Sequence, residues 1–207
     1  ETWATQTLPV NEFEVIVVDN NSTDNSAKLI QTFVADKPNF YYLLETQKGS
    51  TNARHAGASM AKSDILIFCD DDGLFNPECI QEILNVYKTN EEVAAVAGKI
   101  EIQWDAPAPD WIEPYLFMLG RLNYGNEVIF RKDIYLNGGI FSIRKSVFKE
   151  LGGFNPDLVG DYLVGDGDTG LVIKLHKAGK LIGRTPLASM QHLQFVAKQR
   201  TEYDMGR

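Results

Sequence analysis

Three adjacent aspartates, Asp70, Asp71 and Asp72, carry the sharpest chemical signal in this sequence of 207 residues. They follow an apolar run, Ile65 to Cys69, which has the pattern of a buried strand. Neighbouring carboxylates repel one another, so they form either a solvated acidic turn or a site that shares a cation. Carboxylate oxygens suit hard divalent cations such as Mg²⁺ and Mn²⁺. The position at a strand end favours the metal interpretation.

Other carboxylates occupy similar positions. Asp19 ends the apolar run that begins at Glu14, and taken alone it is more simply explained as a strand-to-helix cap. Asp166 and Asp168 lie in a segment that formally fits G-x-G-x-x-G, but two carboxylates there would repel a pyrophosphate. An EF-hand is also excluded, because Lys177 stands where the closing Glu should be. What remains is a pair of acids at a helix N-terminus, either functional or capping.

Basic residues complete the candidate set. Lys48 and Arg54 lie on either side of Gly49 and could pair with phosphates, although the default for each is a solvated charge. His192 lies near a predicted strand end, beyond the last helix. A lone histidine is usually structural, so a metal role for His192 needs support from elsewhere. The helical His55 is open to either interpretation.

The elements that must position these groups alternate along the first half of the chain. Apolar runs predict strands at 14–19, 40–44, 65–69 and 93–102, and helices are expected at 50–61, from Asn76-Pro77 onward, and at 169–178. Alternation of this kind predicts an α/β protein with parallel strands, which bind ligands at their carboxyl ends. Asp19 and the three adjacent aspartates are expected at those ends.

The second half is less regular. Residues 103–137 contain Trp104, Trp111 and Tyr115 without clear periodicity, which is typical of an aromatic binding region or of a loop packed over the sheet. A turn at Gly138-Gly139 and a further strand through Ile143 follow.

Composition narrows the function classes. Hydrophobic residues make up 44% and charged residues 23%, which is ordinary for a globular protein and excludes disorder. A net charge of -8 disfavours nucleic acid and anionic membrane as main partners. No apolar run reaches membrane-spanning length. Cys69 and Cys79 are interpreted as reduced core residues, so we expect a cytoplasmic protein and leave contact with the inner membrane face open.

Taken together, these segments resemble family 2 glycosyltransferases, which have the GT-A fold. The similarity extends over nearly the whole chain and rests on five motifs in the family's order: the Glu14–Asp24 strand and turn, Lys48-Gly49 with Asn52–Gly57, the D-x-D-like Asp70-Asp71-Asp72, Gly138-Gly139 with Gly152-Gly153-Phe154, and Asp168-Thr169 with its helix. His192 falls where many members place a metal-binding histidine.

The resemblance implies a mixed, mainly parallel sheet flanked by helices in one domain. A nucleotide-sugar-binding half at 1–102 is followed by an acceptor-binding and catalytic half at 103–207. It also implies inverting transfer of a sugar from a nucleotide-diphospho-sugar, with a UDP-sugar favoured, to a glycan or lipid-linked acceptor, assisted by Mn²⁺ or Mg²⁺. The implied roles are Asp168 as base, Asp72 and His192 as metal ligands, Asp19, Asn21, Lys48, Arg54, Asp70 and Asp71 in donor binding, and Trp111, Gly138 and Gly139 in acceptor binding.

Three departures from the family pattern matter. The family's opening strand and its nucleotide-contacting loop are absent, so the first strand is expected to be missing. Gly167 and Gly170 replace two acids around Asp168, which makes Asp166 an alternative base. His55 replaces an Asn, which puts one donor contact in question.

Two other functions are kept as alternatives. The segment Asp70 to Gly73 resembles the nucleophile loop of haloacid-dehalogenase-like phosphatases, but that family does not explain the Asp19 motif. The missing strand and Gly167 suggest instead a fragment that binds nucleotide sugars without catalysis.

Overall fold

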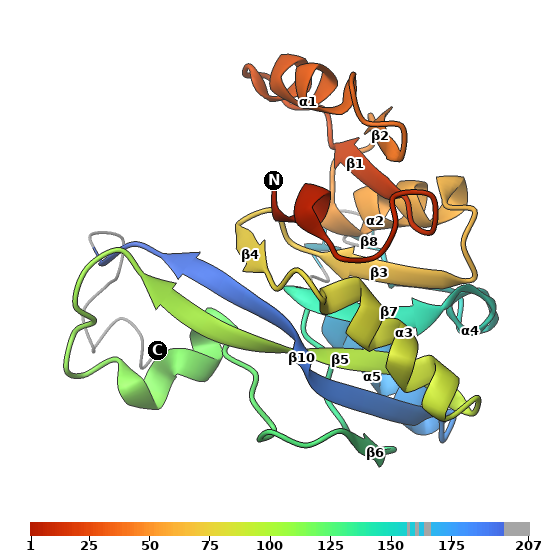
Figure 1. The fold of residues 1–207 in the computed structure, drawn as a ribbon, viewed down its shortest axis with the longest axis vertical. Coiled ribbons are helices and arrows are strands. Elements are labelled where there is room, and N and C mark those ends of the chain that lie inside the picture. The colour runs from red at the N-terminus through yellow and green to blue at the C-terminus, as the bar shows by residue number, and fades with distance from the viewer. Residues whose placement is uncertain (157, 160–161, 164–166, 197–207) are drawn as a thin grey trace.

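The structure is a computed structural model that describes residues 1–156, 158–159, 162–163 and 167–196. Its helices and strands alternate through the first half of the chain, as the sequence predicts (Figure 1). The elements in chain order are η1 (Thr2–Thr5), β1 (Val15–Asp19), α1 (Ser26–Val34), β2 (Phe40–Leu44), α2 (Ser50–Met60), β3 (Ile65–Cys69), β4 (Gly73–Phe75), α3 (Cys79–Thr89), β5 (Val93–Trp104), η2 (Glu113–Leu119), β6 (Ile129–Arg131), β7 (Ile140–Arg144), α4 (Lys145–Glu150), β8 (Leu158–Val159), β9 (Tyr162–Leu163), α5 (Gly167–Lys177) and β10 (Leu181–Gln194).

The central sheet is mixed, which confirms the expected α/β class. Its strand order is β3-β7-β5-β10-β4, and β6 also pairs with β10. Strands β5 and β10 are parallel, while β7 is antiparallel to both β3 and β5, so β3, β5 and β10 run in one direction. Strands β1 and β2 form a separate parallel pair.

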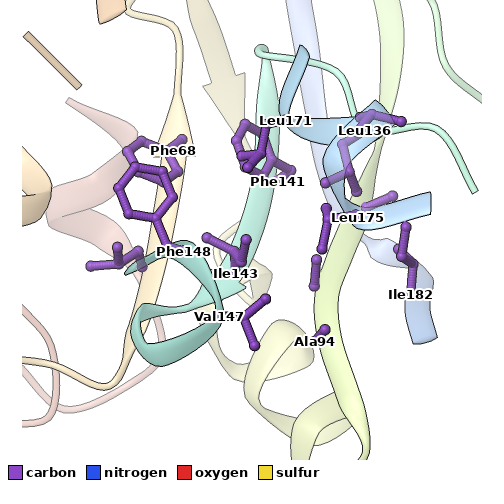
Figure 2. Packing of buried hydrophobic residues seen from close by; sticks show 14 of the residues in the cluster. Phe68, Ala94, Leu136, Phe141, Ile143, Val147, Phe148, Leu171, Leu175 and Ile182 are labelled. Carbon is purple, nitrogen blue, oxygen red and sulfur yellow. The ribbon is translucent and has the colours of Figure 1, made fainter. Parts of the chain in front are cut away.

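Helices cover both faces of the central sheet. Helix α3 packs on one face through Ile83 and Val86, and α4 and α5 pack on the other through residues such as Phe148 and Leu175 (Figures 1 and 2). Burial of these apolar side chains is the main favourable term that holds the layers together. Within the described residues, no helix combines the length and the apolar character that crossing a membrane requires.

Two differences from the sequence expectations bear on the candidate site. Helix α3 begins at Cys79 rather than at Asn76-Pro77, because the Asn76 side chain accepts the Glu78 N–H (2.8 Å) and forms the turn before the helix. The short strand β4, directly after the aspartates, was not predicted from the sequence. It pairs with His192 and its neighbours on β10, so that the acidic turn lies beside that histidine.

The longest strand, β10, contains a wide irregularity. Arg184 lies opposite Ala97 and Ser189 opposite Lys99, so five steps along β10 match two along β5. Three extra residues are therefore accommodated in β10, around Pro186, which lacks the N–H that a regular ladder needs. Downstream of this bulge, β10 resumes its pairing with β5 as far as Gln194.

A buried arginine lies just before the bulge. Arg184 is 0% exposed, and its Nη1 donates to the Glu127 carbonyl (3.0 Å), but Nε and Nη2 have no hydrogen-bond partner among the described residues. Burial lowers the pKa of this guanidinium. Charged groups without a full set of partners cost stability in a protein interior.

We expect Arg184→Met to raise the free energy of unfolding by about 1–3 kcal/mol, because an apolar side chain of similar length removes the desolvated charge. Urea unfolding monitored by circular dichroism measures this, and Lys180→Met, which changes an exposed ion pair with Glu150, is the control. A loss of stability in the Arg184 variant would contradict the argument.

Candidate active site

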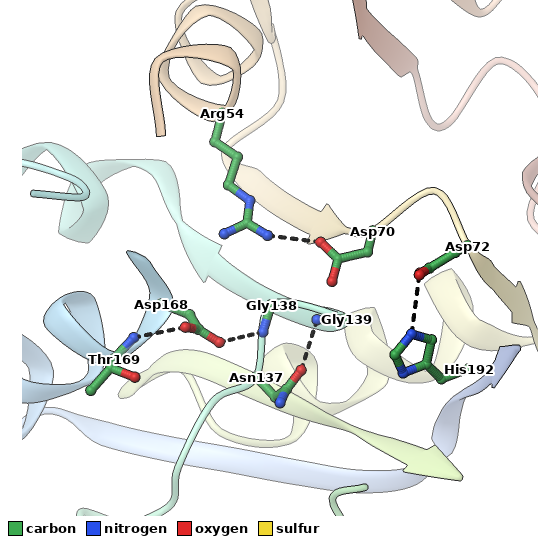
Figure 3. A network of polar contacts seen from close by, with 9 residues as sticks. All are labelled: Arg54, Asp70, Asp72, Asn137, Gly138, Gly139, Asp168, Thr169 and His192. Atoms are coloured by element: carbon green, nitrogen blue, oxygen red, sulfur yellow. Dashed lines mark hydrogen bonds and ion pairs between the residues drawn. The ribbon is translucent and has the colours of Figure 1, made fainter. Parts of the chain in front are cut away.

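An open pocket of about 380 Å³ lies at the carboxyl end of β3. Its lining combines polar side chains with apolar residues of η2 and comprises Asp70, Ile100, Met118, Leu119, Gly120, Asn137, Gly139, His192 and Gln194. Segments more than a hundred residues apart in the chain therefore meet at one place (Figure 3). A concave site with a few convergent polar groups is the usual form of a ligand-binding pocket.

Asp72 and His192 form a nitrogen–oxygen pair at this pocket. Asp72 Oδ2 lies 3.1 Å from His192 Nε2, and the histidine Nδ1 lies 2.8 Å from the Leu119 carbonyl oxygen (Figure 3). Because a carbonyl oxygen only accepts, Nδ1 carries a hydrogen, so in the neutral ring Nε2 is the acceptor atom, which can accept from the Gln194 amide (3.1 Å), whereas a hydrogen bond to Asp72 requires a second hydrogen on Nε2 or a cation between the two atoms. The hydrogen bond from Nδ1 is the arrangement that orients metal-binding histidines.

The Asp72–His192 pair supplies fewer ligands than a metal site made only of protein side chains needs. Among the described residues, no group of three or more His, Cys, Asp or Glu side chains gathers closely enough to hold a cation. One carboxylate and one imidazole still fit a cation that takes its other ligands from substrate phosphates and water, as Mg²⁺ does in many phosphate-handling sites.

Asp70, which lines the pocket, makes an ion pair with Arg54. Its Oδ1 accepts a hydrogen bond from Arg54 Nη2 at 2.8 Å, which links the end of β3 to the first half of α2 (Figure 3). The Arg54 side chain is 19% exposed and that of Asp70 is 45% exposed, so the pair is open to solvent on one side. Exposed pairs contribute little to stability, which leaves both groups available to a ligand.

Asp168 lies in the first turn of α5, held by two main-chain donors. Its Oδ1 accepts the Thr169 N–H (2.9 Å) and its Oδ2 accepts the Gly138 N–H (2.5 Å) (Figure 3). The positive end of the α5 dipole also lies at this carboxylate. An ionised, oriented carboxylate that keeps free lone pairs can take a proton from a hydroxyl group.

The two glycines before β7 bring Asp168 to the pocket. A Cβ atom at Gly138 would lie 2.8 Å from Arg54 Nη2, so a side chain there would displace the guanidinium. Gly139 lines the pocket, and its N–H donates to Asn137 Oδ1 (2.9 Å). Gly138-Gly139 thus joins the aspartate on α5 to the arginine on α2.

Asp19 forms a second polar centre at the end of β1. It is 3% exposed, its Oδ1 accepts the Ser22 N–H (2.8 Å), and its Oδ2 accepts the Tyr42 hydroxyl (2.9 Å). The hydrogen bonds from Ser22, first those of its side chain, lower the pKa of Asp19, and the Tyr42 bond adds to this effect. The carboxylate is therefore kept ionised.

We expect Tyr42→Phe to raise the pKa of Asp19 toward its ordinary value, because one donor to the charged form is lost. A carboxyl pKa that is lower in the folded state than in the unfolded state stabilises the fold at pH values above the unfolded-state pKa. This stabilisation is lost as the pH falls through the folded-state pKa. The Tyr42 variant should accordingly retain less of this stabilisation. Carboxyl carbon NMR titration measures the shift. Tyr41→Phe, the neighbouring hydroxyl deletion, is the control, and equal Asp19 pKa values in the two variants would contradict the assignment.

Comparison with known proteins decides the family. The family model described as Glycosyl transferase family 2 matches residues 3–152. The chain belongs to this family. Its sequence is 25% identical over 197 residues to a glucosyl-dolichyl phosphate glucuronosyltransferase of Haloferax volcanii, an alignment that covers 92% of this chain and 61% of that protein. It is 26% identical over 194 residues to the O-antigen chain rhamnosyltransferase WbaN of Salmonella anatum, covering 86% and 56%.

A solved structure shares the fold of this chain. The crystal structure of S. aureus TarS 1–349 matches with a TM-score of 0.65 at 16% identity and covers 91% of this chain and 53% of that one. This likeness confirms the expected GT-A architecture. The chain spans about 61% and 56% of the lengths of the two family 2 relatives named above.

Several residues singled out by the family 2 resemblance lie away from the contacts just described. Asp71 and Lys48 are exposed, and Asn21 is an exposed residue in the left-handed conformation (φ 60°) beside Asp19. Trp111 packs edge-on against Tyr115 (6.1 Å) and is not among the residues that line the pocket. Their donor and acceptor roles stay predictions, and Asp166 lies outside the described residues.

The structure assigns a packing role to the histidine that departs from the family 2 pattern. His55 Nε2 lies 3.2 Å from the Phe154 carbonyl oxygen, and the ring packs against Phe148 and Phe154. A Cβ at Gly153 would lie 2.3 Å from this ring. His55 therefore fixes the Gly152-Gly153-Phe154 segment.

Sequence reasoning missed three supporting residues in this family 2 site: Tyr42, Asn137 and Gln194. Tyr42 lies opposite Val17 in the β1–β2 register, and only that pairing places its hydroxyl near Asp19. Gln194 follows His192 by two residues on the same strand, a spacing that could have indicated a shared face.

Proposed function

We propose that this chain is the catalytic region of a metal-dependent, inverting glycosyltransferase. It would transfer a sugar from a nucleotide-diphospho-sugar to a hydroxyl group of a glycan or lipid-linked acceptor, in polysaccharide or glycoconjugate synthesis. One observation carries the proposal: the Asp72–His192 pair and the oriented Asp168 carboxylate flank the same Gly138-Gly139 segment (Figure 3).

Donor binding would use the polar groups at the strand ends. The buried Asp19 carboxylate would accept a hydrogen bond from an N–H group of the nucleotide base, and a UDP-sugar is the donor that we propose. Arg54 would leave Asp70 to pair with phosphate, and Asp70 would then accept from ribose hydroxyls. Asp72 and His192 would hold Mn²⁺ or Mg²⁺. When bound, the cation supplies Lewis acidity that stabilises the charge of the departing diphosphate.

Chemistry would be a single displacement. Asp168 takes the proton of the acceptor hydroxyl, and the hydroxyl oxygen forms a bond to the anomeric carbon while the bond from that carbon to the diphosphate oxygen breaks. Attack from the face opposite the leaving group inverts the configuration. The amides of Gly138 and Thr169 hold the carboxylate in place while it accepts the proton.

The names of the relatives support the class of reaction but differ in sugar. One is a glucuronosyltransferase acting on glucosyl-dolichyl phosphate, and the other is an O-antigen chain rhamnosyltransferase. Because the two names give different sugars, the proposal extends to nucleotide-sugar transfer and leaves the sugar itself to experiment.

The test combines binding with turnover. We expect UDP to raise the melting temperature of the chain with Mn²⁺ present and not with EDTA, GDP to have a smaller effect, and a mixture of radiolabelled UDP-sugars to be transferred to an acceptor pool or slowly hydrolysed. Asp19→Asn should remove the effect of UDP. Nucleotide binding without any turnover would replace the proposal by the non-catalytic alternative. Turnover of a chromogenic phosphate ester with Mg²⁺, without UDP stabilisation, would replace it by the phosphatase.

A further inference from the structure

A third polar side chain reaches the Asp72–His192 pair. Gln194 lines the candidate pocket together with His192, and its side-chain Nε2 lies 3.1 Å from His192 Nε2. The same ring nitrogen lies 3.1 Å from Asp72 Oδ2. One imidazole nitrogen is therefore within contact distance of both an amide and a carboxylate.

Main-chain hydrogen bonds place these three side chains together. Gln194 and His192 are two residues apart on β10, so their side chains leave the same face of the strand. The Asp105 N–H donates to the Gln194 carbonyl (3.1 Å), which fixes the end of β10 beside the end of β5. The Leu193 N–H donates to the Asp72 carbonyl (3.2 Å), which fixes the acidic turn beside the same strand. The position of each side chain thus follows from the fold.

The hydrogens at His192 leave the contact with Asp72 in need of a positive charge. Because Nδ1 donates to the Leu119 carbonyl, Nε2 of the neutral ring only accepts, and it can accept from the Gln194 amide. The Asp72 carboxylate also only accepts, yet it lies 3.1 Å from that nitrogen. Two acceptor atoms at this distance attract each other only through a proton or a metal cation that both contact.

The two separations of 3.1 Å are those expected of neighbouring ligands on one cation. Mg²⁺ binds six ligands in an octahedron at about 2.1 Å, and Mn²⁺ also suits octahedral oxygen sites, so adjacent ligand atoms lie about 3 Å apart. A carboxylate oxygen and an amide group at this distance from one imidazole nitrogen fit two edges of such an octahedron.

The amide of Gln194 can present either of its two polar atoms to the site. Rotation by half a turn about the last side-chain bond exchanges the nitrogen for the carbonyl oxygen, and this torsion is soft. Amide oxygens of Asn and Gln are among the hard ligands that divalent cations take in proteins. The side chain that donates to His192 through nitrogen can therefore contact a cation through oxygen.

We propose that Gln194 is a third protein ligand of the cation at this site, through its side-chain oxygen, beside Asp72 and His192. The inference rests on the proposed function, from which it takes Mn²⁺ or Mg²⁺ as the cation. An amide, a neutral imidazole and a carboxylate bring one negative charge to a doubly charged ion. Since cation affinity rises with the charge of the ligands, the chain alone binds the cation weakly. The two phosphates of a nucleotide-diphospho-sugar supply the remaining charge, so the cation and the donor bind together.

Removal of the amide gives results of opposite sign for the two possible roles of Gln194. As a ligand, it makes Gln194→Leu bind Mn²⁺ about tenfold more weakly, since changes behind the first ligands already cost about 10- to 100-fold. As a donor to His192 alone, it would compete with the cation for the ring nitrogen, and Gln194→Leu would bind Mn²⁺ more tightly. Electron paramagnetic resonance of free Mn²⁺ during a titration without nucleotide measures both. Tighter or unchanged binding overturns the proposal.

Addition of a charge at the same position is the second test. Gln194→Glu should bind Mn²⁺ without nucleotide about tenfold or more tightly than the natural chain, because a second carboxylate joins the site. Asp72→Asn in the same chain should remove most of this gain, since both groups bind one cation. A Gln194→Glu variant with no gain, or with a gain that survives Asp72→Asn, overturns the proposal. This variant gives an answer even where the natural chain binds Mn²⁺ too weakly to measure.

The matched control is Gln103→Glu. Gln103 lies opposite Leu193 in the β5–β10 register, so it adds the same charge next to Gln194 but on the other face of the sheet, and Mn²⁺ binding should not change. Melting curves without metal check that each variant folds. Neither titration needs nucleotide or sugar, so a chain that failed to bind UDP would contradict the proposed function and still show whether Gln194 binds the cation.

Discussion

Replacing Asp168 with Asn is expected to lower sugar transfer about 100- to 10,000-fold, the usual contribution of a general base. The amide is nearly the same size as the carboxylate but cannot take a proton from the acceptor. Its nitrogen would also face the N–H of Gly138 or Thr169, which the carboxylate oxygens now accept. Initial rates with saturating donor, together with UDP affinity from calorimetry, separate loss of chemistry from loss of binding.

The matched control is Asp36→Asn, which removes an exposed carboxylate paired with Lys37 and should leave both measurements unchanged. UDP affinity should also remain unchanged in the Asp168 variant. Full transfer activity in that variant would remove Asp168 from the mechanism and turn attention to Asp166, the alternative base suggested by the sequence.

The second large effect concerns the metal. We expect EDTA to abolish transfer and Asp72→Asn to weaken Mn²⁺ binding in the presence of UDP about 100-fold or more, since even changes behind the first ligands cost about 10- to 100-fold. Asp72 supplies the only carboxylate in contact with His192 within the described part of the chain, so the loss leaves the imidazole without a charged partner there. Electron paramagnetic resonance of free Mn²⁺ during a titration gives the affinity directly.

His192→Ala should weaken Mn²⁺ binding in the same titration, while Asp36→Asn should not. Because Asp72 is 54% exposed, its replacement is not expected to affect folding, which thermal melting without metal verifies. An unchanged Mn²⁺ affinity in both the Asp72 and the His192 variants would show that the cation, if needed, binds elsewhere.

The parts of the fold that could be predicted are those where a short stretch of sequence is continuously apolar. The runs at Val15–Asp19 and Ile65–Cys69 are continuous and apolar, and both form the expected strands with aspartates at their carboxyl ends. A continuous apolar run predicts a strand without knowledge of its neighbours, although Val15 to Val18 are only partly buried here rather than buried on both faces. That is why the positions of Asp19 and Asp70 followed from sequence alone.

Properties that depend on pairing could not be predicted in the same way. The Tyr42 hydroxyl meets Asp19 only because β1 and β2 pair in one particular register, and the Leu119 carbonyl meets His192 across 73 positions of the chain. Local sequence also cannot show that His55 supports Phe154, since a polar residue on a helix is equally compatible with a solvent-facing role. Contacts of this type are determined by tertiary structure.

The bulge in β10 constrains how this protein can change in length during evolution. Side chains alternate between the two faces of a strand, and the bulge adds an odd number of residues, three, between Arg184 and Ser189. Insertion or deletion of a single residue there would turn His192 to the opposite face of the sheet, away from Asp72. Homologues that keep this histidine opposite the aspartate should therefore have a segment of the same length or one that differs by two residues. A difference of one residue in length should coincide with loss of the histidine.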